Sequence, residues 1–103
     1  MSRHYYTRIE ILETLEIEAE FLIALEREAI VLADAPSDRS EEFSELMLER
    51  ARVAYNLTRD LGVNLQGVAI IVRMREQMQD QRQQIERFLV DLEPHLRSSE
   101  QDL

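Results

Sequence analysis

Apolar side chains recur at helical spacing from the start of the chain. Thr7 and Glu10 have the spacing of a capping box, in which each side chain bonds the backbone of the other residue. Ile9, Leu12 and Leu15 then follow at three-residue steps and are expected to share one face. This pattern predicts a short helix that begins at about Thr7.

A second helix is predicted from about residue 18 to residue 29. Phe21, Leu22 and Leu25 form its apolar stripe. A polar residue, Glu16, interrupts the chain between the two apolar patterns. Two short helices separated by a tight break have the outline of a helix-turn-helix motif.

The middle of the chain contains one clear loop and a third helix. Residues 33–42 are rich in Asp and Ser and are predicted to be a loop. Ser44 is expected to cap the third helix and Gly62 to end it. Asn64 is expected to cap the last helix. The pattern therefore predicts a head domain over residues 5–62.

The last helix, predicted over residues 64–93, carries the longest apolar pattern. Its apolar residues are spaced alternately three and four residues apart, as in a coiled-coil seam. Gln81 is a polar interruption of this pattern. Residues 94–103 are expected to be a flexible tail. A second copy packing seam on seam would cover these side chains, so we predict a homodimer and leave the helix orientation open. The seam residues are Ile71, Met74, Met78, Ile85, Phe88 and Leu92.

Composition supports a nearly all-α fold. The chain of 103 residues has only two glycines and two prolines, whereas strand-rich folds need more turn residues. No cysteine is present, which excludes disulfides and thiolate metal sites. The N-terminus lacks the apolar run of a signal peptide, and no segment approaches the roughly 20 apolar residues of a membrane span. We therefore expect a cytoplasmic protein without a membrane partner.

Charge is distributed unevenly along the chain. The net charge is −9, with thirteen acidic and four basic residues in positions 1–49 and eight of each in positions 50–103. Proteins bind nucleic acids largely through Lys and Arg contacts to phosphate. DNA is therefore not an expected partner of the acidic head.

Several short runs carry a family resemblance over roughly residues 5–90. They are Tyr6-Thr7-Arg8-Ile9, Leu15 with Ile17, Leu25-Glu26-Arg27-Glu28, Phe43-Ser44-Glu45 and the joint from Asn56 to Val68. The joint contains a Leu-Gly-x-x-Leu-x-x-Val pattern. Together with the order of elements, these runs resemble the MerR-like winged-helix family. The resemblance implies a helix-turn-helix head with a long C-terminal dimerisation helix.

Within this family the chain is most similar to the chaperone-modulator branch. The joint over residues 64–70 resembles that branch, and the short length implies no effector domain after the last helix. Members of the branch bind the J-domain of a DnaJ- or CbpA-type co-chaperone. The resemblance therefore implies an inhibitor that covers the basic second helix of a J-domain and excludes the Hsp70 chaperone from it.

The residues that read DNA in this family are replaced here. In a DNA-binding member, Arg and Tyr side chains of the second helix contact phosphates and base edges. Glu20 and Ile23 stand in place of two arginines, and Ala24 in place of a tyrosine, while Arg27 remains. A carboxylate facing phosphate weakens DNA binding.

The loop at 33–42 stands where the family has its wing. Four acidic residues accompany a single basic residue, Arg39, although a wing that grips phosphates should carry the opposite balance. The acidic residues are Asp34, Asp38, Glu41 and Glu42.

These replacements suggest a surface for a cationic protein. The candidate residues for contact with a J-domain are Glu13, Glu16, Glu20, Ile23 and Arg27. A simpler interpretation is that each acid lies on an ordinary solvated helix face. Phe21 and Ile23 are candidate apolar anchors, although core packing is the more ordinary role for Phe21.

No pattern indicates an enzyme, a cofactor site or a metal site. His4 and His95 are far apart in the sequence and lack metal-ligand spacing. The pair Glu13 and Glu16 could perform acid–base chemistry only if both were buried close together. Two alternatives stay open beside the adaptor: a MerR-type DNA-binding transcriptional regulator and a structural dimer without a regulatory partner.

Overall fold

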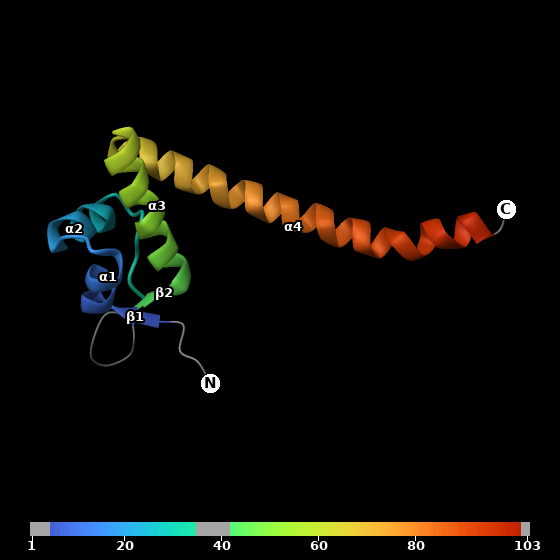
Figure 1. Cartoon of the computed structure of the whole chain (residues 1–103), viewed down its shortest axis with the longest axis horizontal. Coiled ribbons are helices and arrows are strands. Elements are labelled where there is room, and N and C mark those ends of the chain that lie inside the picture. Colours follow the sequence, from blue (N-terminus) through green and yellow to red (C-terminus); the bar gives the residue numbers. More distant parts are fainter. Residues whose placement is uncertain (1–4, 35–41, 102–103) are drawn as a thin grey trace. The chain divides into compact units, whose positions relative to one another are not determined.

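The computed structural model describes the backbone of residues 5–34 and 42–101, with side chains as far as residue 94. The chain forms two compact units, residues 1–72 and 73–103, which are described separately below. As predicted, the fold is nearly all-α (Figure 1). The described elements are β1 Tyr5–Thr7, α1 Arg8–Leu15, α2 Ala19–Arg27, β2 Glu42–Ser44, α3 Glu45–Leu61 and α4 Leu65–Gln101.

The capping box at the start of α1 is confirmed. The Glu10 N–H donates to Thr7 Oγ1 at 3.2 Å, and the Thr7 N–H donates to Glu10 Oε1 at 3.0 Å. Glu16 caps the C-terminus of the helix with a left-handed φ of 55°. The Ile17 N–H then donates to the Leu12 carbonyl and closes the turn toward α2. The predicted helix-turn-helix outline is therefore present.

The buried face of α1 differs from the predicted one. Ile11 is fully buried, whereas Ile9 is 66% exposed. Leu12 and Leu15 pack partly against the core, as expected. Successive three-residue steps drift around a helix that has 3.6 residues per turn, so Ile9 leaves the stripe that Ile11, Leu12 and Leu15 share.

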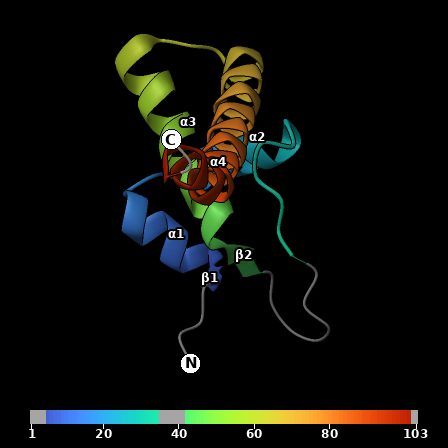
Figure 2. The same cartoon turned by 90° about the vertical axis from the view of Figure 1, so that its right-hand side faces the viewer.

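A small sheet, absent from the predicted elements, joins two distant segments of the head. β1 pairs antiparallel with β2, with Tyr5 opposite Ser44 and Thr7 opposite Glu42 (Figure 2). The Asp34 N–H also donates to the Glu42 carbonyl at 2.8 Å. The ends of the predicted wing-like loop are thus paired, while residues 35–41 lie outside the described part. Strands of three residues are too short to show a period-two pattern.

Local capping signals also set the limits of α3. The Met47 N–H donates to Ser44 Oγ at 3.3 Å at the start of the helix. Gly62 ends it with a φ of 66°, and the Val63 N–H donates to the Leu57 carbonyl. Both caps agree with the prediction, because they depend on residues within one helical turn.

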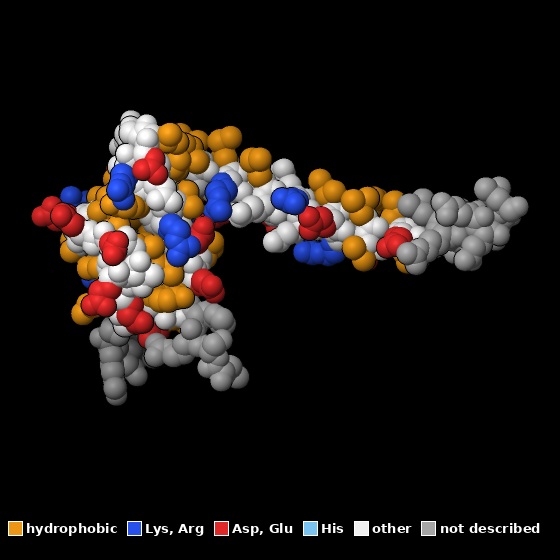
Figure 3. All heavy atoms as spheres, in the orientation of Figure 1, with side chains coloured by type: hydrophobic (Ala, Val, Ile, Leu, Met, Phe, Trp, Pro, Cys, Tyr) orange, Lys and Arg blue, Asp and Glu red, His pale blue; other side chains and the backbone are white. Residues whose placement is uncertain are grey.

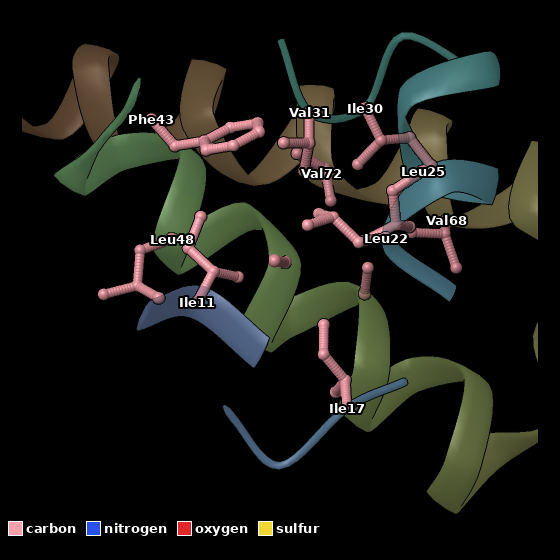
Figure 4. Packing of buried hydrophobic residues seen from close by; sticks show 12 residues of the cluster. Ile11, Ile17, Leu22, Leu25, Ile30, Val31, Phe43, Leu48, Val68 and Val72 are labelled. Atoms are coloured by element: carbon pink, nitrogen blue, oxygen red, sulfur yellow. The ribbon is translucent and has the colours of Figure 1, made fainter. Parts of the chain in front are cut away.

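One hydrophobic core lies in the unit of residues 1–72 (Figure 4). Val68 and Val72, from the first turns of α4, complete it. As predicted, Asn64 caps α4, since its Oδ1 accepts the Gly67 N–H at 2.8 Å. The buried residues are Ile11, Ile17, Leu22, Leu25, Ile30, Val31, Phe43, Leu48, Ala51, Ala54, Val68 and Val72.

Beyond residue 72, all but one of the predicted seam side chains are exposed within the single chain. Met78 and Phe88 are 66% and 64% exposed, Met74 and Ile85 are also exposed, and Leu92 is partly buried. Among the described helices, none combines the length and hydropathy that a bilayer crossing requires.

The end of α4 lies beyond the predicted one. We expected the helix to stop near residue 93, but it continues past Pro94 to Gln101. A proline inside a helix removes one backbone hydrogen bond and bends the axis, and the surrounding turns can still remain helical. The flexibility expected for residues 94–103 stays a prediction.

Candidate partner-binding surface

Three of the five predicted partner-binding residues share one exposed face of α2. Glu20, Ile23 and Arg27 follow one another at steps of three and four residues, which places them along one side of a helix. All three are exposed, whereas Leu22 and Leu25 on the opposite side are fully buried. The packing of α2 therefore turns this stripe toward solvent.

The other two predicted residues lie before α2. Glu13 is exposed in α1, and Glu16 is exposed at the left-handed residue that ends this helix. Within the described part, no hydrogen bond or ion pair connects either of them to the α2 stripe. Figure 3 shows acidic side chains spread over the visible face of the head. The five residues thus share exposure, and three of them share a face.

The charged groups of this surface have no partners among the described residues. No hydrogen bond or ion pair there involves the side chain of Glu13, Glu16, Glu20 or Arg27. Glu26, which precedes Arg27, is paired, because its carboxylate accepts two hydrogen bonds from Arg8, at 2.8 and 3.0 Å. The unpaired carboxylates remain available to an external cation.

The Arg8–Glu26 pair was not predicted from the sequence. Arg8 begins α1, Glu26 lies in the last turn of α2, and the guanidinium also lies 5.5 Å from the ring centre of Phe43. This contact joins the two helices of the helix-turn-helix. No local spacing could have revealed it, because the partners are 18 residues apart and meet only through packing.

The two candidate apolar anchors have different environments. Phe21 packs against the core and meets Tyr55 edge to face, with ring centres 5.7 Å apart. Ile23 is 43% exposed and lies between the charged residues of the stripe. Phe21 is therefore a packing residue, and Ile23 is the side chain that a partner can cover.

The described residues contain no metal-site geometry. No group of three or more His, Asp or Glu side chains among them could hold a metal ion. His4 and the side chain of His95 lie outside the described part. Glu13 and Glu16 are exposed, so they lack the close burial that acid–base chemistry would require.

Comparison with known proteins identifies related sequences. A family model described as "MerR HTH family regulatory protein" matches residues 6–89. The chain is also 26% identical over 82 residues to the chaperone modulatory protein CbpM of Coxiella burnetii strain Dugway 5J108-111. The same protein from strain RSA 331 / Henzerling II matches equally, and each alignment covers 77% of both chains. No solved structure matches the chain.

Proposed function

Since the chain belongs to the MerR helix-turn-helix family of regulatory proteins, we propose that it is a chaperone-modulator adaptor. It binds the J-domain of a DnaJ- or CbpA-type co-chaperone and inhibits it. The similarity to proteins named chaperone modulatory protein supports this proposal. The contact residues are Glu13, Glu16, Glu20, Ile23 and Arg27.

One observation carries the proposal: the charged groups of the exposed surface, three carboxylates and one guanidinium, have the wrong balance for a DNA reader. Glu20 is exposed and unpaired within the described part, and Ile23 is exposed where a DNA-binding member has an arginine. Phosphate would be repelled by the carboxylates of Glu13, Glu16 and Glu20, whereas a basic helix would be attracted to them. The proposed ligand is therefore a cationic protein surface.

The proposed binding combines electrostatic attraction with the burial of an apolar side chain. Glu13, Glu16 and Glu20 steer a basic J-domain helix toward the head, and Ile23 anchors it by losing its exposed apolar surface. Once docked, the adaptor would cover the basic helix that the Hsp70 chaperone needs. We propose that this binding takes place in the cytoplasm. The protein that binds would be a homodimer held together by the α4 seam.

Charge reversal at the head tests this site. The double variant Glu16→Arg, Glu20→Arg should weaken binding to a purified J-domain by about tenfold or more, because two attractive contacts become repulsive. Isothermal titration calorimetry measures the affinity, and circular dichroism checks that the variant remains folded.

A matched control separates the site from the overall charge. Asp60 and Asp80 are exposed and lie outside α1 and α2, so reversing both to Arg changes the net charge equally. This control should alter the affinity by less than about threefold, since exposed charges outside the contact surface are screened by salt. A folded Glu16→Arg, Glu20→Arg variant with unchanged affinity would move the site elsewhere, first to the acidic run at 41–49.

A second candidate function is DNA-binding transcriptional regulation. The description of the matching family model and the exposed Arg27 favour it. A salt-dependent electrophoretic shift of promoter DNA by the purified protein, lost on Arg27→Ala, would support this function over the adaptor. Binding to the J-domain without a DNA shift supports the adaptor.

A further inference from the structure

The apolar stripe of α4 is interrupted at its centre by a polar side chain that forms no hydrogen bond with other described residues. Figure 3 shows hydrophobic side chains on two stretches of α4, with polar and charged side chains between them. Here the Gln84 amide donates to Asp80 at 3.1 Å, and Arg82 donates to Glu86 at 3.2 Å. Gln81 occupies the seam position, and no hydrogen bond of the described part involves its amide.

We propose that Gln81 meets Gln81 of a second copy and that this contact selects the register of the homodimer. The inference rests on the homodimer of the proposed function and is independent of the J-domain. A primary amide carries both donors and an acceptor, so two copies can satisfy each other. A Glu or Arg at a position that meets its own copy would instead face a like charge.

The alternative registers leave this amide unsatisfied. A shift of one helical turn would place Gln81 against Met78 or Ile85 of the second copy, both of which are exposed apolar side chains in the single chain. An amide buried against apolar groups loses its bonds to water without replacement. Polar residues in coiled-coil seams are known to specify register in this way, at a cost in stability.

The chemistry of α4 favours a second copy as the occupant of the stripe. The seam residues alternate three- and four-residue steps, the repeat that lets a helix pack along another helix of the same repeat. Residues 65–101 of α4 carry six acidic and five basic side chains, so two copies can meet along α4 without strong repulsion. The acidic residues 1–49 lack this balance.

Gln81→Leu tests the proposal by its effect on the dimer. Removing the polar interruption should tighten dimerisation by about tenfold or more, as measured by analytical ultracentrifugation. Gln79→Leu is the matched control, because Gln79 lies on the other side of α4, outside the seam. It should change the dimer dissociation constant by less than about twofold.

A distance measurement tests the register itself. The chain has no cysteine, so Gln83→Cys, an exposed position outside the seam, accepts a single spin label. Pulsed electron paramagnetic resonance should show one narrow distance between labels in the dimer. Adding Gln81→Leu should broaden it into several distances, because the apolar seam no longer prefers one alignment.

The outcomes distinguish this proposal from the adaptor function. Unchanged or weaker dimerisation of Gln81→Leu, or a single narrow distance in that variant, overturns the role of Gln81. A monomeric wild-type chain at micromolar concentration overturns both the homodimer and the role of Gln81. A dimer with the expected Gln81 behaviour but no affinity for a J-domain overturns only the adaptor.

Discussion

At the residue scale, two positions of the head adopt a left-handed backbone without being glycine. Glu16 has a φ of 55° and Ala29 a φ of 56°. Such a conformation costs an L-residue roughly 1 to 2 kcal/mol relative to glycine. Glu16 is also a proposed contact residue, so a side chain proposed to bind the partner occupies a position where glycine would be more stable.

Glycine substitutions at these two positions should separate stability from binding. Both Glu16→Gly and Ala29→Gly relieve the left-handed strain, which stabilises the folded state. Glycine also raises the conformational entropy of the unfolded chain, which opposes this gain. Each variant should therefore raise the free energy of unfolding by up to about 1 kcal/mol. Urea denaturation measures this change. Only Glu16→Gly should weaken J-domain binding, because only it removes a carboxylate of the proposed surface.

Ala29→Gly is the internal control for this comparison. It makes the same kind of backbone change and leaves the charge of the head unaltered. Equal affinities of the two variants for the J-domain would remove Glu16 from the proposed site. A loss of stability in both variants would contradict the account of backbone strain.

At the element scale, α4 combines two roles along one continuous helix. Its first turns complete the core through Val68 and Val72, which are buried, while its later turns expose the seam. A charge placed within the seam should therefore disrupt a homodimer without affecting the core. Head folding and dimerisation are expected to be separable.

Met78→Glu with Ile85→Glu tests this separation. Burying a carboxylate in an apolar seam costs several kcal/mol, so the variant should be monomeric in analytical ultracentrifugation at concentrations where the wild type is dimeric. Nuclear magnetic resonance signals of residues 5–34 should stay dispersed. A variant that still dimerises with wild-type affinity would exclude this stripe as the interface.

At the scale of the whole molecule, charge segregation predicts how the proposed binding to a J-domain responds to salt. The first 49 residues hold thirteen acidic and four basic side chains, so attraction to a basic partner acts at long range. The Debye length falls from about 10 Å at 0.1 M to about 3 Å at 1 M ionic strength. The affinity for a J-domain should therefore decrease as salt increases.

Calorimetry across a salt series checks this expectation. Raising NaCl from about 0.05 M to about 0.5 M should increase the dissociation constant by about tenfold, because an added salt screens exposed pairs. The apolar contribution of Ile23 should persist at the highest concentration. A dissociation constant that does not change with salt would contradict electrostatic steering by the acidic head.

Features that depend on neighbouring residues could be read from the sequence. The caps at Thr7, Ser44, Gly62 and Asn64 all lie where the pattern placed them, because each involves partners within about one helical turn. The long helical repeat of α4 was predictable for the same reason. The positions of Glu20, Ile23 and Arg27 on one side of α2 also follow from helical spacing alone.

Features that depend on distant residues were decided by the tertiary structure. Packing buries Ile11 and exposes Ile9, pairs β1 with β2, and brings Arg8 to Glu26 across 18 residues. These contacts form only when the whole head folds around its core. They cannot be predicted from the spacing of neighbouring residues. The sequence by itself determined the helices, their caps and the acidic character of the head, whereas folding decided which of those acids remain unpaired and exposed.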